Sequence, residues 1–184
     1  MTDSPSRLTD ADLAALVRTI PGFPKAGIMF RDISTLLLDP DGLRTSIERL
    51  ATTAPAAVDL VAGIEARGFI FASALAFVLN KGLLLIRKDG KLPGATIAED
   101  YALEYGADRI VMHADACALG QKVLLVDDLI ATGGTAMAAV RLVRQAGAEV
   151  VGASFIIDLP KLKGSEKLRK AGVSVTSLLH FDDD

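Results

Sequence analysis

The chain has 184 residues, of which 51% are hydrophobic and 23% charged, with a formal net charge of −3, one cysteine and two histidines. This length and composition fit a single domain with a sizeable core, and they exclude a disordered chain, an internal disulfide and a structural zinc site. The acidic balance argues against nucleic-acid and anionic-membrane partners, which attract excess lysine and arginine, and the cysteine usage fits a reducing, cytoplasmic setting.

The first elements surround a turn-rich loop. Residues 9–20 begin with a capping-box-like T-x-x-D, carry apolar residues at helical spacing and stop before a proline, which predicts an amphipathic helix. Residues 21–27 (PGFPKAG) form a loop, and residues 39–50 open on Asp-Pro and predict a second amphipathic helix.

From residue 58 onward, apolar strands alternate with helices. Strands that are apolar on both faces and alternate with helices are typical of an α/β fold with a parallel sheet. Asn80 and Lys81 interrupt the longest apolar stretch, so we expect no membrane span. The predicted strands are residues 58–64, 83–86, 122–126, 149–157 and 173–178, and the predicted helices are residues 68–80, 135–146 and 160–170.

Residues 87–100 (RKDGKLPGATIAED) depart from this alternation, because they are polar and rich in glycine and proline. An irregular segment of this length inside a compact domain is typical of a lid over a functional site. The alternative is a loop without a role.

The most informative segment is residues 123–135 (VLLVDDLIATGGT). Four apolar residues form a strand, Asp127 and Asp128 lie at its carboxyl end, and two glycines with two threonines lead into a helix. Ligands of open α/β sheets bind at this edge. Backbone N–H groups at a glycine-rich turn and a helix N-terminus bind anions, so the segment predicts a phosphate site beside two carboxylates.

The same segment restricts the ligand. It lacks the lysine of the nucleoside-triphosphate motif G-x-x-x-x-G-K-[ST], and no G-x-G-x-x-G follows the first predicted strand. One phosphate site close to Asp127 and Asp128 fits a ribose 5-phosphate whose hydroxyls bind the two acids. Alternatively, the acidic pair binds a metal or caps the helix, and the glycines form an ordinary turn.

Residues 123–135 resemble the phosphoribosyl pyrophosphate signature of the type I phosphoribosyltransferases. Four more segments, in the same order, are similar to the adenine phosphoribosyltransferases of that family: residues 21–34 (PGFPKAGIMFRDIS), 63–71 (GIEARGFIF), 86–94 (IRKDGKLPG) and 101–106 (YALEYG). The resemblance implies a central, mainly parallel sheet flanked by helices. It also implies one domain over residues 1–184, with a base-binding hood within residues 1–35 and a flexible lid or β-ribbon over residues 87–106.

The resemblance further implies which residues bind phosphoribosyl pyrophosphate. Asp127 and Asp128 bind the ribose hydroxyls, and the pyrophosphate lies beside Glu65, Ala66 and Arg67, where members of the family often have a cis peptide bond. The 5-phosphate is bound by Ala131, Thr132, Gly133, Gly134 and Thr135.

Four cations are implied to bind the pyrophosphate. Arg67 suits bidentate phosphate contact, although it could instead cap the following helix at the surface. Arg87, Lys88 and Lys91 begin the implied lid and would offset charge on the leaving group, although charges in a loop are often only solvated.

Glu104 is the implied general acid or base, because a carboxyl group near the purine can move the proton that changes as the glycosidic bond forms. Its alternative is a solvent-facing position on a β-ribbon. Tyr105 packs on the lid or contacts the ligand, or it has a purely structural role.

Base recognition is implied to lie in residues 27–32. The resemblance implies that backbone groups near Met29 and groups around Arg31 recognise adenine, and that Phe30 packs near the base. Adenine needs an acceptor for its exocyclic amine. Arg31 could instead pair structurally with Asp32 or Asp128.

The implied reaction combines adenine with phosphoribosyl pyrophosphate to give AMP and pyrophosphate, a step of purine salvage. The resemblance implies a homodimer and Mg²⁺ held mainly by the pyrophosphate oxygens. Two alternatives remain: transfer to hypoxanthine, xanthine, guanine or uracil, and a non-catalytic regulator that senses the sugar phosphate.

Overall fold

The computed structural model describes residues 8–103 and 106–182. In this part of the chain, the main sheet has the strand order β5-β6-β4-β3-β7-β8-β9, and β1 and β2 form a separate antiparallel ribbon. The strands are β1 (Arg18–Pro21), β2 (Met29–Asp32), β3 (Leu60–Ile64), β4 (Gly82–Lys88), β5 (Thr96–Leu103), β6 (Gly106–His113), β7 (Lys122–Ile130), β8 (Glu149–Asp158) and β9 (Val175–His180). The helices are α1 (Asp10–Ala15), α2 (Ser34–Leu38), α3 (Pro40–Thr53), α4 (Gly68–Leu79), α5 (Gly134–Gln145) and α6 (Gly164–Lys170), with a 3-10 turn η1 (Pro160–Leu162).

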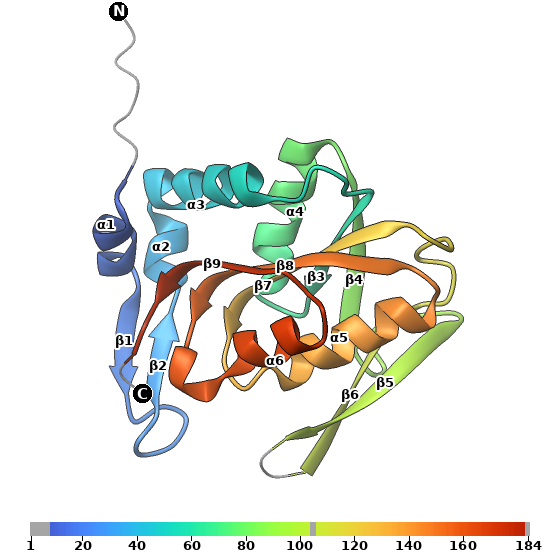
Figure 1. Cartoon of the computed structure of the whole chain (residues 1–184). Coiled ribbons are helices and arrows are strands. Elements are labelled where there is room, and N and C mark those ends of the chain that lie inside the picture. Colours follow the sequence, from blue (N-terminus) through green and yellow to red (C-terminus); the bar gives the residue numbers. More distant parts are fainter. Residues whose placement is uncertain (1–7, 104–105, 183–184) are drawn as a thin grey trace, which may run out of the picture.

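The sheet is mainly parallel and is covered on both faces. β3, β4, β7, β8 and β9 run parallel, whereas β6 pairs antiparallel with β4 and β5. Helices α3 and α4 lie on one face, and α5 and α6 lie on the other (Figure 1). The predicted α/β fold with a mainly parallel sheet is therefore confirmed.

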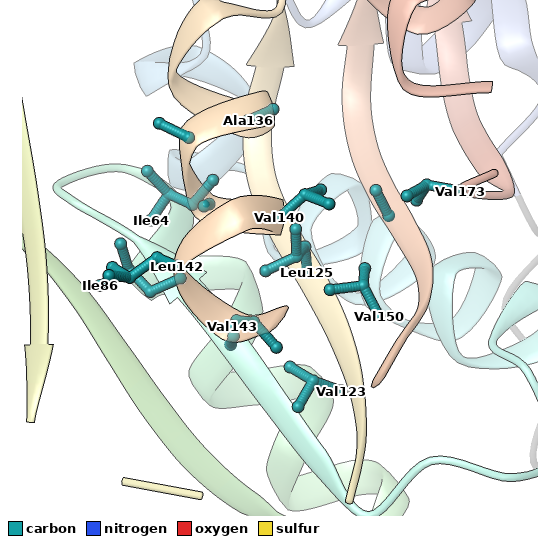
Figure 2. Packing of buried hydrophobic residues seen from close by; sticks show 14 of the residues in the cluster. Ile64, Ile86, Val123, Leu125, Ala136, Val140, Leu142, Val143, Val150 and Val173 are labelled. Atoms are coloured by element: carbon teal, nitrogen blue, oxygen red, sulfur yellow. The ribbon is translucent and has the colours of Figure 1, made fainter. Parts of the chain in front are cut away.

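Each face of the sheet has its own apolar core. Phe71 and Leu75 of α4 are fully buried on one face. On the other face, Val140 and Val143 of α5 pack against strand residues that include Leu125 (Figure 2). This packing fixes the start of α5 at the carboxyl end of β7, where the carboxylates of the predicted site lie.

The prediction of one helix over residues 9–20 is wrong in its second half. The capping box of Thr9 and Asp12 is present, but α1 ends at Ala15 and β1 follows. Ile20 lies opposite Phe30 in the β1–β2 ribbon, so pairing with a distant strand overrides the local helical spacing.

Three further boundaries differ from the predictions. Residues 96–100 belong to β5 and not to an irregular loop, because they pair with β6 along its length. β7 runs on to Ile130, so Asp127 and Asp128 lie inside the strand. The predicted helix over residues 160–170 is split by Lys163, whose φ is +60°. No helix in residues 8–103 or 106–182 is both long and apolar enough to cross a membrane.

Candidate active site

The carboxyl half of β7 brings two acidic side chains to the edge of the sheet. Asp128 is 5% exposed, and its backbone N–H donates to Asp127 Oδ1 at 2.9 Å. Gly133, and neither aspartate, occupies the N-cap position of α5. The alternative that the acidic pair caps the helix is therefore wrong, and both carboxylates remain available to a ligand.

The loop between β7 and α5 is shaped by two glycines that touch. Gly133 has φ +72°, which only glycine adopts without strain, and a Cβ there would lie 2.9 Å from Gly164 Cα. The Gly164 N–H donates to the Ala131 carbonyl at 3.0 Å. No side chain of the described residues caps α5, so its first N–H groups and the positive end of the helix dipole could bind an anion.

The end of β3 supplies the first cation. The Glu65–Ala66 peptide bond is cis, as the resemblance implied. Arg67 occupies the N-cap position of α4, but its Nε lies 2.6 Å from Asp128 Oδ2 as an ion pair. The orientation of the two groups does not meet the criteria of a hydrogen bond, and Asp128 Oδ2 has no hydrogen-bond partner among the described residues. A buried carboxylate oxygen is thus left for a further donor.

The end of β4 supplies two more cations, both joined to carboxylates. Arg87 Nε donates to Glu65 Oε2 at 3.1 Å, and the Lys88 N–H donates to the same oxygen at 3.0 Å. Burial would raise the pKa of Glu65, but these two donors outweigh it and lower that pKa. Lys88 Nζ lies 2.8 Å from Asp108 Oδ2.

The β5–β6 hairpin contributes two residues that the sequence reasoning missed. Tyr101 and Asp108 lie opposite each other, and the Tyr101 hydroxyl donates to Asp108 Oδ2 at 3.0 Å. Burial raises the pKa of the Tyr101 hydroxyl. Residues 96–103 (TIAEDYAL) lack the strict alternation of apolar and polar residues that indicates a strand, so no local pattern signalled this hairpin.

These groups surround one cavity of about 620 Å³. It joins the ends of β3, β4 and β7, the hairpin and the start of α5, so the anion site and the two carboxylates face the same space. The residues that line it are Glu65, Ala66, Arg67, Lys88, Tyr101, Asp108, Asp127, Asp128, Leu129, Ile130, Ala131, Thr132, Gly133, Gly134, Thr135 and Ala136.

Most of the predicted site residues meet in this cavity, but several do not. Arg87 does not line the cavity, but it donates a hydrogen bond to Glu65, which does. Lys91 is exposed in the turn after β4, and its backbone N–H donates to the Lys88 carbonyl. Glu104 and Tyr105 lie outside the described residues.

The predicted base-binding residues lie on β2 and do not line the cavity. Phe30 is the link to it, since the Arg67 guanidinium lies 5.4 Å from the centre of the Phe30 ring. Arg31 is 4% exposed, donates to the Thr19 hydroxyl and lies over the Phe181 ring at 4.3 Å. Asp32 forms an ion pair with Arg18 at 2.7 Å, and Asp128 forms one with Arg67.

Asp127 is the acid with the strongest electrostatic perturbation. Its burial and the adjacent Asp128 carboxyl raise the pKa of Asp127 well above its ordinary value. Gly68 allows this close packing, because a Cβ there would lie 2.7 Å from Asp127 Oδ1. This pair of carboxyl groups therefore favours one negative charge over two.

Replacing Asp127 by asparagine is expected to change how the stability depends on pH. A raised pKa in the folded protein contributes stability at low pH, and this is lost as pH rises through that pKa. Urea denaturation at about pH 5 and about pH 8 should show the unfolding free energy of D127N rising relative to wild type as pH increases. Asn in place of Asp100, whose pKa is lowered by Arg109, should give the same difference from wild type at both pH values, because that carboxyl is ionised in the folded and unfolded protein throughout this range. The same difference for D127N at both pH values would contradict the raised pKa.

Comparison with known proteins places these features in a family. Residues 40–180 match the model of the phosphoribosyl transferase domain. The chain is 56% identical over 172 residues to adenine phosphoribosyltransferase of Rhodopseudomonas palustris strain BisB18, covering 93% of this chain and 86% of the relative.

Solved structures agree with this relationship. The adenine phosphoribosyltransferase of Rhodothermus marinus is 47% identical, with a TM-score of 0.87 over 94% of this chain and 98% of that one. The enzyme of Saccharomyces cerevisiae, solved with an imino-altritol bisphosphate and adenine, is 36% identical, with a TM-score of 0.86 over 92% of this chain and 98% of that one.

Proposed function

Since the chain belongs to the adenine phosphoribosyltransferase family, we propose that the cavity at the carboxyl end of β7 binds its substrates. The enzyme transfers the 5-phosphoribosyl group of phosphoribosyl pyrophosphate to adenine, giving AMP and pyrophosphate in purine salvage. One observation carries the assignment of the site: the Asp127–Asp128 pair and the uncapped start of α5 open into the same cavity.

The sugar phosphate fits the two halves of this arrangement. The 5-phosphate would accept hydrogen bonds from N–H groups of residues 131–135, with the positive end of the α5 dipole behind them. The ribose hydroxyls would donate to Asp127 and Asp128. The buried Asp128 Oδ2, which lacks a hydrogen-bond partner among the described residues, is an acceptor in place for one of these hydroxyls.

The pyrophosphate would bind among the cations at the ends of β3 and β4. Arg67 is paired with the carboxylate of Asp128, and Arg87 with that of Glu65. These ion pairs hold the guanidinium groups at the cavity before the ligand arrives. A pyrophosphate offers more oxygens for bidentate arginine contact and would bind them without requiring large movements.

Adenine would bind between the cavity and β2. The contact of Arg67 with Phe30 joins the phosphate side of the site to the strand that carries Met29 and Arg31. Adenine is present in the yeast relative, which supports a base site in this fold. Backbone carbonyl groups near Met29 would accept from the exocyclic amine of the base.

Glu104 would take part in the chemistry. The bond from the anomeric carbon to the pyrophosphate oxygen breaks, the bond to the purine nitrogen forms, and the proton on that nitrogen must leave. A carboxylate near the imidazole ring would accept this proton or stabilise the positive charge that develops. The cations and the helix dipole would stabilise the departing pyrophosphate.

Mg²⁺ fits this site as a partner of the pyrophosphate. Among residues 8–103 and 106–182, no three or more His, Cys, Asp and Glu side chains gather as a metal cage. The carboxylates of Asp127 and Asp128 are among the oxygen donors that line the cavity, and Mg²⁺ commonly takes one or two carboxylates together with substrate phosphates and water. When bound, the ion would neutralise charge on the pyrophosphate.

Radiolabelled adenine tests the function directly. The protein, incubated with phosphoribosyl pyrophosphate and Mg²⁺, should form labelled AMP, and a chelator should stop the reaction. Hypoxanthine, guanine, xanthine and uracil should react poorly under the same conditions. A preference for a 6-oxopurine would contradict the adenine assignment, and tight binding of phosphoribosyl pyrophosphate without product from any base would favour the regulator.

An exposed apolar face on α4 and β4 supports the proposal of a homodimer. Ile70, Phe77 and Val78 of α4 are 42%, 87% and 54% exposed. Leu83 and Leu85 of β4 are 40% and 39% exposed, and alternation with the core residues of that strand turns them toward the α4 side of the sheet. A second copy of the chain would remove this apolar face from water.

Replacing Phe77 by aspartate should therefore separate the protomers. A charge in a buried apolar interface is costly, so sedimentation equilibrium should show the mass fall from that of a dimer to that of a monomer. Leu119→Asp is the matched control, because Leu119 is 88% exposed but packs beside Gly147, away from this face. A dimer that survives in F77D, or a monomeric wild type, would contradict the proposed interface.

A further inference from the structure

We propose that Asp108 is a positioning residue for pyrophosphate binding, which it serves by fixing the ammonium group of Lys88 over the cavity. The inference rests on the proposed function, because Lys88 is assigned there to the pyrophosphate. Asp108 itself lies outside every segment that carried the family resemblance.

The contacts of Asp108 form a continuous polar chain across the cavity wall. Lys88 Nζ and the Tyr101 hydroxyl both donate to Asp108 Oδ2, at 2.8 and 3.0 Å. Tyr101 is 7% exposed and lines the same cavity as Thr135, one of the residues of the proposed phosphate site. Lys88 and Asp108 line this cavity too. Asp108 therefore joins a proposed pyrophosphate ligand to a side chain in the wall of the proposed phosphate site.

The carboxylate is itself held in place. Its Oδ1 accepts from the backbone N–H of Arg109 at 2.9 Å, while Oδ2 accepts from Lys88 and Tyr101. The hydrogen bond to Lys88, with that from the Arg109 N–H, lowers the pKa of Asp108, so the group stays charged. β5 and β6 pair directly at Tyr101 and Asp108, which fixes both side chains on one face of the hairpin.

Lysine needs such a partner more than arginine does. Its ammonium group is a point charge on a flexible four-carbon stem, and ordering that stem on ligand binding costs conformational entropy. Asp108 takes one of the three N–H donors of Lys88 and leaves two for pyrophosphate oxygens. The ligand then meets an ammonium group that is already in place, so its affinity benefits from the preorganisation.

The neighbouring ion pair on the hairpin provides a matched comparison. Arg109 Nε lies 2.6 Å from Asp100 Oδ1, so this pair is as close as that of Lys88 and Asp108. However, the Asp100 side chain is 63% exposed against 25% for Asp108, and neither Asp100 nor Arg109 lines the cavity. Removal of Asp100 takes a salt bridge from the same hairpin without touching the proposed site.

Steady-state kinetics of Asp108→Ala and Asp108→Asn test the proposal. We expect D108A to raise the KM for phosphoribosyl pyrophosphate about tenfold, the effect of losing one charge-assisted contact, with the KM for adenine and kcat within about twofold. D108N, which keeps the shape and an acceptor, should give a smaller rise, and D100A should behave as wild type. In a Lys88→Met background, D108A should add no further rise, because both changes remove the same interaction.

Several results would overturn the proposal. An unchanged or lower KM for phosphoribosyl pyrophosphate in D108A would show that Asp108 does not position Lys88 or competes with the ligand for it. Additive effects of D108A and K88M, or equal changes in every kinetic constant, would indicate a merely structural role. If D108A does not fold, the KM and kcat of D108N are judged by the same criteria. Wild-type protein that forms no AMP would instead contradict the proposed function.

Discussion

Replacing Gly164 by alanine is expected to lower kcat/KM for phosphoribosyl pyrophosphate by about 100-fold. A Cβ at this position would lie 2.3 Å from the Ala131 carbonyl oxygen and 2.8 Å from the Gly133 nitrogen. Both are backbone atoms of the proposed phosphate site, so relief of the clash must move the N–H groups that would bind the 5-phosphate. A displacement of about 1 Å at such a site costs roughly two orders of magnitude in rate.

The matched control for this change is Gly82→Ala. A Cβ on Gly82 would approach the Leu60 Cδ2 methyl group at 2.8 Å, and the end of a flexible side chain can move aside. G82A should keep kcat/KM within about twofold, while G164A should also lose roughly 1–3 kcal/mol of unfolding free energy from overpacking. Normal kinetics in G164A would show that the loop beside Gly164 does not bind the phosphate.

Glu104→Gln is expected to lower kcat by about 10²–10⁴-fold, the usual contribution of a positioned general acid or base. Glutamine keeps the size of the side chain but can neither accept the purine proton nor carry the negative charge that stabilises it. Affinity for AMP, measured by calorimetry, should stay near that of wild type, because the nucleotide is bound by other groups.

Two results would separate the possible roles of Glu104. Turnover within a few-fold of wild type, with AMP affinity unchanged, would contradict the acid–base role and leave the site assignment intact. A raised KM with normal kcat would make Glu104 a binding residue. The pH profile of kcat should lose its limb on the acid side in E104Q if Glu104 acts as the base.

The sheet and the position of the proposed phosphate site could be predicted from the sequence because their signals are local. Apolar runs near 60–64 and 149–158 have the length and composition of buried parallel strands. The segment from Asp127 to Thr135 carries acids, glycines and hydroxyls in one continuous stretch. Its place at a strand end followed from the alternation of strands and helices.

Features that depend on pairing between distant segments could not be predicted from local sequence patterns. The local sequence of residues 18–21 predicts a helix, but in the structure they pair with residues 29–32 as a strand. The local sequence of residues 96–103 predicts a loop, but they pair with residues 106–113. No local sequence pattern singles out Asp108, because its proposed role depends on contacts with Lys88 and Tyr101 on other strands. Gly164 supports Gly133 from 31 positions further along the chain, a contact that no local pattern specifies.

A crystal structure with AMP bound tests the central claim most directly. We expect the phosphate of AMP within hydrogen-bond distance of the backbone N–H groups of residues 131–135, with its ribose hydroxyls on Asp127 and Asp128. AMP found elsewhere on the protein, with residues 127–135 making no contact to it, would contradict the assignment of the site and the mechanism built on it.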